Sequence, residues 1–318
     1  MIDRYGREIS YLRISLTDLC NLRCLYCMPA EGVSKLQHRE ILSIEEIVEI
    51  SAVAVELGIT KIRLTGGEPL VRRGIVELVR RLKALTGLEE LVLTTNGILL
   101  PGLAQPLRDA GLDRINISLD TLDAEKYRRL TRIGSLEDAL AGIRAAEQTG
   151  LTPIKLNAVL LGGINDDEIS ALVELTRTRP IELRFIELMP IGDASPFPPE
   201  TYIPGDTVLQ RVPELRPADH HPGSTARLYR LPGAVGSVGL ISPVSCSFCG
   251  ECNRIRLTAD GYLKPCLHSD REFFLRGLHG EALKQAFRAA VDAKPEAHAA
   301  LSAAERSEAG RNMNEIGG

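Results

Sequence analysis

Three cysteines near the start of the chain have the type and spacing of iron-sulfur ligands. Cys20, Cys24 and Cys27 form a C-x3-C-x2-C array. Three thiolates on a short loop can bind three irons of a [4Fe-4S] cluster and leave the fourth iron open to a small molecule. The alternative is a structural zinc loop, which usually needs a fourth Cys or His; His38 is the only nearby candidate, and this spacing is unusual for zinc. The array therefore indicates a cluster with one open iron.

Four more cysteines lie near the end of the chain, and none lies between the two groups. Cys249, Cys252 and Cys266 form a C-x2-C-x13-C array, and Cys246 precedes them by the same x2 spacing. In a reducing compartment, clustered cysteines are more often metal ligands than disulfides. The second group is therefore a further candidate metal site.

Basic residues occur where strands are expected, which predicts an anion site. Arg254 and Arg256 alternate along one strand and so project to the same face, while Arg13 and Arg63 have apolar strand neighbours. Burying a guanidinium is costly unless it meets an anion, and arginine suits phosphate oxygens because of its forked donors. The alternative is a set of inward salt bridges with Asp and Glu. Two further candidates are Lys155 and Arg184.

The elements that must position these residues follow an α/β pattern. Short β-branched runs alternate with amphipathic stretches such as 44–57, 75–85 and 136–149, which implies parallel βαβ units. Six such units would make either a partial barrel or an open doubly wound sheet, and the pattern does not decide between them. The six expected strands are residues 11–16, 61–64, 91–94, 114–119, 154–160 and 183–188.

The periodicity fails at a proline-rich connection over residues 192–222. Beyond it, residues 227–231, 238–241 and 255–257 are expected to be short strands, and 281–292 a helix. We therefore expect two domains, residues 1–192 and a smaller α+β module over 193–318.

Composition excludes several classes of protein. The 318 residues are 44% hydrophobic and carry a formal charge of −4, with no apolar run long enough to span a membrane. The isoelectric point of about 6.0 argues against nucleic-acid binding. The first residues lack the pattern of a secretory signal, so we expect a cytoplasmic protein.

The residues around the first cysteines closely resemble the radical S-adenosylmethionine (SAM) signature. They read Ser15-Leu16-Thr17-Asp18-Leu19-Cys20-Asn21-Leu22-Arg23-Cys24-Leu25-Tyr26-Cys27-Met28-Pro29, and Thr65-Gly66-Gly67-Glu68-Pro69 resembles the GGEP motif of the same superfamily. The resemblance implies a partial (β/α)6 barrel whose open side is covered by the C-terminal module. It also implies SAM as cofactor, held by Tyr26, Gly67, Ser118 and Met189.

The second cysteine group, with Asn253-Arg254-Ile255-Arg256 directly after Cys252, resembles the C-terminal half of the GTP 3′,8-cyclase family, also known as molybdenum cofactor biosynthesis protein A. The resemblance implies a second [4Fe-4S] cluster on Cys249, Cys252 and Cys266, whose open iron binds the purine of GTP. Cys246 departs from the family pattern, and we interpret it as a spare thiol. The GTP residues implied are Arg13, Arg63, Thr94, Lys155, Arg184, Arg254, Ile255 and Arg256.

The chain ends in Gly317-Gly318, which is read as a frayed tail, as a ubiquitin-like tail or as the family's catalytic terminus. The cysteine groups favour the last, so removing both glycines should abolish turnover and leave both clusters intact.

The leading hypothesis is thus a lyase that cyclises GTP in molybdenum cofactor biosynthesis. An electron donor and a downstream pterin-forming enzyme are its expected partners, and a homodimer is left open. Other radical SAM maturases with a second cluster do not call for concentrated arginines, and a simple electron carrier has no use for the GGEP motif.

Overall fold

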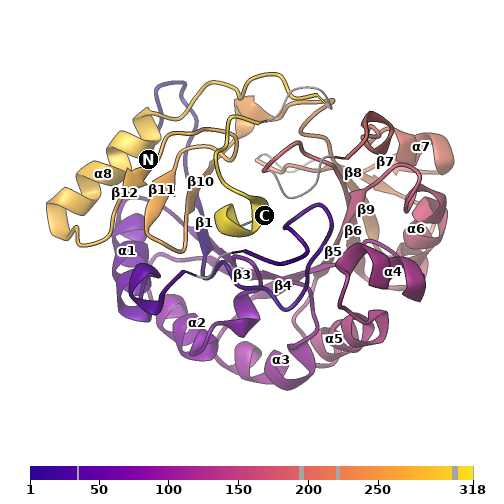
Figure 1. Ribbon diagram of the computed structural model, residues 1–318, viewed down its shortest axis with the longest axis horizontal. Coiled ribbons are helices and arrows are strands. Elements are labelled where there is room, and N and C mark those ends of the chain that lie inside the picture. Colours follow the sequence, from indigo (N-terminus) through magenta and orange to yellow (C-terminus); the bar gives the residue numbers. More distant parts are fainter. Residues whose placement is uncertain (34–35, 193–196, 220–222, 303–306, 318) are drawn as a thin grey trace.

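The computed structural model describes residues 1–33, 36–192, 197–219, 223–302 and 307–317. A continuous sheet runs through it in the strand order β12-β11-β10-β1-β2-β3-β4-β5-β6-β9-β8-β7. The sheet curves, with helices on its outer side and the C-terminus inside the curve (Figure 1). None of the helices in these described ranges is long and apolar enough to cross a membrane.

Strands β1 to β6 are parallel and lie next to one another in chain order, as in a partial barrel. Hydrophobic side chains of the strands and the surrounding helices form the main core. In β5 and β6 buried and half-buried residues alternate, so one face packs in the core and the other faces the inside of the curve. The six strands are β1 (Tyr11–Ser15), β2 (Lys61–Thr65), β3 (Glu90–Thr95), β4 (Arg114–Ser118), β5 (Ile154–Leu160) and β6 (Ile181–Glu187).

The helices between these strands begin and end at recognisable signals. At the start of α1 the Ser43 hydroxyl accepts from the Glu46 N–H, and the Glu46 carboxylate accepts from the Ser43 N–H. The two bonds form a capping box. Helix α5 packs on α3, and Gly142 of α5 leaves room for the backbone at Gly97 in the loop before α3. The helices are α1 (Ile44–Glu56), α2 (Ile75–Lys83), α3 (Leu100–Asp109), α4 (Ala124–Thr131), α5 (Leu136–Gln148) and α6 (Ile169–Thr178).

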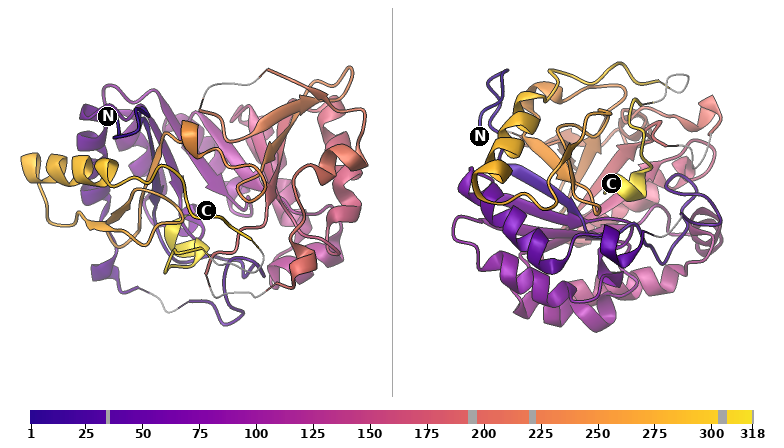
Figure 2. Two further views of the ribbon diagram at one scale, coloured as in Figure 1. Left: turned by 90° about the horizontal axis from the view of Figure 1, so that it is seen from above. Right: turned by 60° about the vertical axis from the view of Figure 1, so that its left-hand side comes forward.

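C-terminal strands extend both edges of this parallel sheet. Strand β10 (Arg254–Leu257) pairs with β1, and β9 (Ser237–Ile241) pairs with β6, both in parallel. Two further views show the C-terminal segments beside β1 at one edge and α9 inside the curve (Figure 2). The remaining elements are α7 (Thr207–Arg211), β7 (Arg216–Pro217), β8 (Arg227–Arg230), β11 (Tyr262–Lys264), β12 (Phe273–Phe274), α8 (Gly280–Asp292) and α9 (Met313–Ile316).

The predicted partial barrel is confirmed, and each expected strand is present to within two residues at either end. The connection expected over residues 192–222 also carries α7 and β7, which its prolines had hidden. The strands beyond residue 192 continue the same sheet rather than forming a sheet of their own.

Candidate active site

The inner face of the sheet surrounds a cavity of about 560 Å³. Both cysteine groups line it: the first follows the carboxyl end of β1, whereas Cys252 precedes the amino end of β10, which is parallel to β1. Cys246 is not among the lining residues, and its side chain is exposed. The cavity is within the size range of small-molecule sites. The six cysteines that line it are Cys20, Cys24, Cys27, Cys249, Cys252 and Cys266.

The first cysteine group lies on the loop after β1, at the carboxyl end of the parallel strands. The backbone N–H groups of Cys27 and Met28 both donate to the Cys24 carbonyl, which makes a tight turn. Arg23 donates to the Cys20 carbonyl over 2.7 Å, and Arg132 donates to the carbonyls of Arg23 and Met28. The loop is therefore held by its backbone, and its three thiols are left to face the cavity.

Burial and mutual repulsion disfavour three bare thiolates in this loop. Burial raises the pKa of Cys20 to about 11 and, with the nearby Cys20 and Asp120, that of Cys27 to about 12. Burial and then Cys27 are the leading causes of the raised pKa of Cys24. Ligands crowded in this way are stabilised by a positively charged metal centre. No three His, Cys, Asp or Glu residues of the described chain are placed to hold a single metal ion. The three thiols lie on one short loop that lines the cavity, and they fit a cluster that takes each thiolate on a different iron.

Gly67 brings the loop after β2 against the first cysteine loop. Its N–H donates to the Thr17 carbonyl over 2.7 Å, and the Glu68 N–H donates to the Leu19 carbonyl over 2.8 Å. A Cβ at position 67 would lie 2.7 Å from the Asp18 carbonyl oxygen and closer still to that of Leu19. Glycine is therefore required here by close backbone approach rather than by an unusual φ.

Buried acids fix the residues that surround the loop. Glu68 accepts from the Thr95 hydroxyl over 2.7 Å and from the Asn96 N–H over 2.8 Å. Burial raises the pKa of Glu68 to about 7, although these bonds oppose the rise. Asp120 accepts a bond of 2.7 Å from the Tyr26 hydroxyl, and burial raises its pKa to about 6. Tyr26 is thereby held against the cavity wall.

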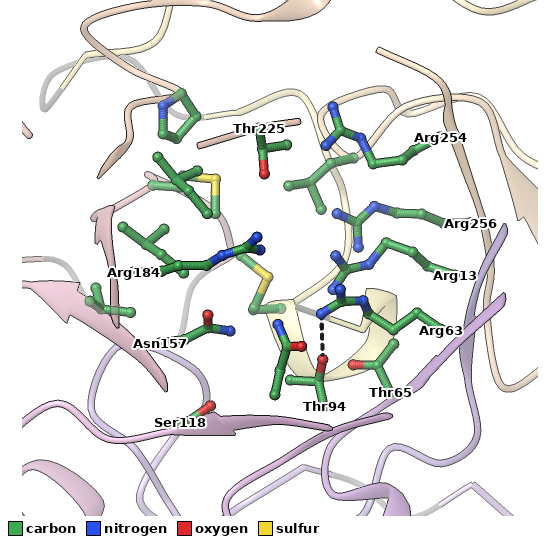
Figure 3. Close-up of a pocket in the computed structure, with 18 of the residues that line it drawn as sticks. Arg13, Arg63, Thr65, Thr94, Ser118, Asn157, Arg184, Thr225, Arg254 and Arg256 are labelled. Atoms are coloured by element: carbon green, nitrogen blue, oxygen red, sulfur yellow. Dashed lines mark hydrogen bonds between the residues drawn. The ribbon is translucent and has the colours of Figure 1, made fainter. Parts of the chain in front are cut away.

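Four arginines form a row on the inner face, called here the arginine row (Figure 3). Its members are Arg254 and Arg256 of β10, Arg13 of β1 and Arg63 of β2. The strand register places these arginines side by side, because Arg13 pairs laterally with Arg256 on one side and with Arg63 on the other. Burial, and then the charge of Arg254, lower the pKa of Arg256 to about 10. An anion in front of the row would offset the repulsion between these like charges.

Arg63 and Arg254 contact hydroxyl, aromatic and cysteine side chains rather than carboxylates. Arg63 donates to the Tyr11 hydroxyl and, over 2.9 Å, to the Thr94 hydroxyl. Arg254 stacks on the Phe248 ring at 5.1 Å. In the described part of the chain, no carboxylate forms an ion pair with Arg63, Arg254 or Arg256. Inward salt bridges with Asp or Glu, the alternative to an anion site, are therefore not formed by these three arginines within the described ranges.

Lys155 and Arg184 face the row from the other side of the cavity, and here the salt-bridge alternative holds. Glu182 accepts from Lys155 over 2.6 Å and from Arg184 over 2.5 Å. Figure 3 shows Arg184 pointing toward the arginine row. Burial, and then the Arg184 charge, lower the pKa of Lys155 to about 8. Glu182 is a site residue that the sequence analysis missed, although it alternates with Arg184 along β6.

The second cysteine group lies beside the arginine row and has the opposite electrostatics. Burial alone would raise the pKa of Cys252, but the charges of Arg254 and Lys294 outweigh it and lower the pKa to about 6. A hydrogen bond from His298 likewise overcomes burial and lowers the pKa of Cys249 to about 7. Thiolates are the form that binds iron, so this donor set also fits a cluster.

The C-terminal helix α9 brings Gly317 to the arginine row. Arg256 donates to the Gly317 carbonyl, and Arg13 does so over 3.5 Å. Asn314 anchors the helix by donating to the Asp18 carbonyl over 3.3 Å. Gly318 lies outside the described residues.

Most of the predicted site residues meet in this cavity. The side chain of Ile255 does not, because it is fully buried in the main core. The side chain of His38 lies outside the described part of the structure. The predicted residues that line the cavity, besides the cysteines and the arginine row, are Tyr26, Gly67, Thr94, Ser118, Lys155, Arg184 and Met189.

Comparison with solved structures supports the fold. The chain superposes on Streptococcus suis SuiB with a TM-score of 0.60 at 16% identity, covering 90% of this chain and 69% of that one. The SAM-bound structure of SuiB gives a TM-score of 0.56 at 15% identity, covering 88% and 68%.

Comparison with protein families and curated sequences supports a narrower assignment. Residues 14–176 match the radical SAM superfamily, and residues 181–300 match the family described as Molybdenum Cofactor Synthesis C. A GTP 3′,8-cyclase of Alkaliphilus oremlandii is 50% identical over the whole of both chains. One of Peptoclostridium acidaminophilum is 52% identical over all of this chain and 98% of its own. This chain therefore belongs to the GTP 3′,8-cyclase family of radical SAM enzymes.

Proposed function

We propose that this chain converts GTP to its 3′,8-cyclised product, 3′,8-cyclo-7,8-dihydroguanosine 5′-triphosphate, an early step of molybdenum cofactor biosynthesis. The arginine row is the observation that carries this proposal. It concentrates positive charge in the cavity lined by both cysteine groups. A triphosphate needs several cations at once, and forked guanidinium groups suit its oxygens.

Cys20, Cys24 and Cys27 would hold the first [4Fe-4S] cluster, with SAM beside it. When bound and reduced, this pair would supply the 5′-deoxyadenosyl radical, which would take the ribose C3′ hydrogen; C3′ would then bond to C8 of guanine, and one further electron and one proton would complete the 7,8-dihydro product. Tyr26 is fixed by Asp120 to pack beside the adenine. Gly67 exposes backbone for the amino group, and Ser118 and Met189 complete the SAM side of the cavity.

The arginine row would bind the triphosphate, with Lys155 and Arg184 on its far side. Glu182 holds the last two in place and limits the net positive charge there. Arg63 also positions the Thr94 hydroxyl, which can then contact the substrate. Because these groups are already oriented, little ordering is needed when the nucleotide binds.

Cys249, Cys252 and Cys266 would hold a second [4Fe-4S] cluster whose open iron takes the purine. Cys246 would stay outside this set, since its side chain is exposed away from the cavity. Gly317 and Gly318 would take part in catalysis from a position beside the arginine row, to which α9 brings Gly317. We also propose the division into residues 1–192 and 193–318, a reducing cytoplasmic location, an external electron donor and supply to a pterin-forming enzyme.

The test is anaerobic reconstitution with iron and sulfide, followed by incubation with SAM, a reductant and GTP deuterated at C3′. We expect deuterium in the 5′-deoxyadenosine and a cyclised nucleotide, whereas ATP should give neither. Arg63→Gln should weaken GTP binding by at least tenfold, because it removes one cation of the arginine row. The matched control is Arg80→Gln, since Arg80 lies exposed on α2 and pairs there with Glu77.

Deuterium-free 5′-deoxyadenosine formed equally with GTP, ATP or no nucleotide would overturn this function. Equal loss of GTP binding in both arginine variants would argue against the arginine row as the phosphate site.

A further inference from the structure

Lys294 follows α8 and is almost completely buried, with 2% of its surface exposed. Its ammonium donates to the Arg254 carbonyl over 2.8 Å, to the Pro265 carbonyl over 2.9 Å and to the Cys252 Sγ over 3.4 Å. An ammonium has three N–H donors, so all three are used. In the described chain no carboxylate pairs with Lys294, which leaves the Cys252 sulfur as its anionic partner.

The three acceptors lie on two separate segments of the second cysteine group. Cys252 and Arg254 belong to the segment that enters β10, whereas Pro265 directly precedes Cys266 after β11. One ammonium therefore ties together the backbones that carry two of the three cysteines. A buried ammonium is costly to desolvate, and this cost is offset where it faces a thiolate.

The third cysteine is fixed to the same stretch of chain by Arg7. Its guanidinium donates to the Cys249 carbonyl over 2.7 Å, to the Glu296 carbonyl over 2.8 Å and to the Pro295 carbonyl over 2.6 Å. Asp3 orients that guanidinium through a buried ion pair of 2.7 Å. Residues 294–296 thus support all three cysteine segments, and Lys294 is the member that contacts a sulfur.

We propose that Lys294 is a positioning residue for the second cysteine group. Its fixed positive charge and its hydrogen bond to Cys252 hold the ligands together and favour the reduced form of the cluster bound there. The inference rests on the second cluster of the proposed function. Hydrogen bonds to the sulfurs and local net charge set the potential of an iron-sulfur cluster, and outer partners of ligands contribute to metal retention.

The experiment isolates the second group in a parent chain with Cys20→Ala, Cys24→Ala and Cys27→Ala. Lys294→Met removes the charge and all three bonds at similar length. Lys294→Gln removes the charge but keeps amide donors, and it carries the test if the Met variant does not fold. The matched control is Lys264→Met: Lys264 is fully buried on β11, but it donates to the Ser269 carbonyl over 2.8 Å and to Glu272 over 3.0 Å.

Iron and sulfide per chain, and the midpoint potential followed by electron paramagnetic resonance, are the two readouts. In both Lys294 variants we expect at least a tenfold loss of iron affinity, or a reduction equilibrium constant at least tenfold lower. The latter is a negative shift of about 59 mV for one electron. Lys264→Met should keep the parent's iron content and potential.

If both Lys294 variants kept the iron content and potential of the parent, or if Lys264→Met changed them equally, the role of Lys294 would be overturned while the second cluster would stand. A parent chain that binds no iron would overturn the second cluster itself, and the role of Lys294 with it.

Discussion

Gly67→Ala should selectively damage the first cysteine loop. The backbone at Gly67 has a φ that alanine accepts, so the effect is steric. The added Cβ would lie 2.7 Å from the Asp18 carbonyl oxygen, and ordinary contact begins at 3.4 Å. The Leu19 carbonyl oxygen would lie closer still, so the two loops must separate by more than about 0.7 Å, at a cost of about 1–3 kcal/mol.

That separation strains the hydrogen bonds from Gly67 to Thr17 and from Glu68 to Leu19, and Cys20 is the next residue. We expect the affinity of Cys20, Cys24 and Cys27 for iron to fall at least tenfold, and we expect the affinity for SAM to fall with it. The assay is iron per chain and SAM affinity in a chain that lacks the second cysteine group. The control is Gly102→Ala on the exposed side of α3, where a Cβ meets nothing within 4 Å. Wild-type iron and SAM affinity in Gly67→Ala would refute the steric argument.

Three further predictions concern single side chains. The positive charge of Lys155 is present below its pKa of about 8 and is lost above it. The value of kcat/KM for GTP should therefore fall about tenfold between pH 7 and 9. Lys155→Arg should flatten this pH profile, and an unchanged slope in that variant would contradict the assignment. Glu187 is buried and accepts from the N–H groups of Gly205, Val244 and Ser245. Glu187→Gln should therefore lower the free energy of unfolding, measured by denaturant titration, by about 2–3 kcal/mol. A loss smaller than the experimental error would show that these hydrogen bonds are not needed for stability. Cys246→Ala should keep the iron content of the wild type, because the exposed thiol lies outside the cavity, and loss of a whole cluster would make it a ligand.

The parallel strands were predictable because their hydrophobic runs are continuous and strand-sized. The helix α3 was harder to foresee, since Gly102 and Pro106 disfavour a helix interior, and burial of its apolar residues together with packing against α5 and α2 offsets them. Likewise α7 and β7 form among prolines that by themselves indicate a loop.

The candidate site was predictable where residue type and motif spacing carry the chemistry, as for the cysteines. The lateral pairing of Arg13 with Arg256 was not, because it depends on the register between strands far apart in the chain. Glu182 and Lys294 were missed for a related reason. Each acts through a partner on another element, and neither belongs to a motif.

The pairing of β10 with β1 also affects the order in which parts of the protein fold during synthesis. Asn253 hydrogen-bonds to Ser10 across 243 residues of sequence, and this contact leads into the β1 and β10 pair. Contacts of such long range form late, after most of the chain has left the ribosome. The loop with Cys20 can therefore fold early, while half of the arginine row arrives only with the last quarter of the chain. The arginine row is thus complete only when synthesis is nearly finished.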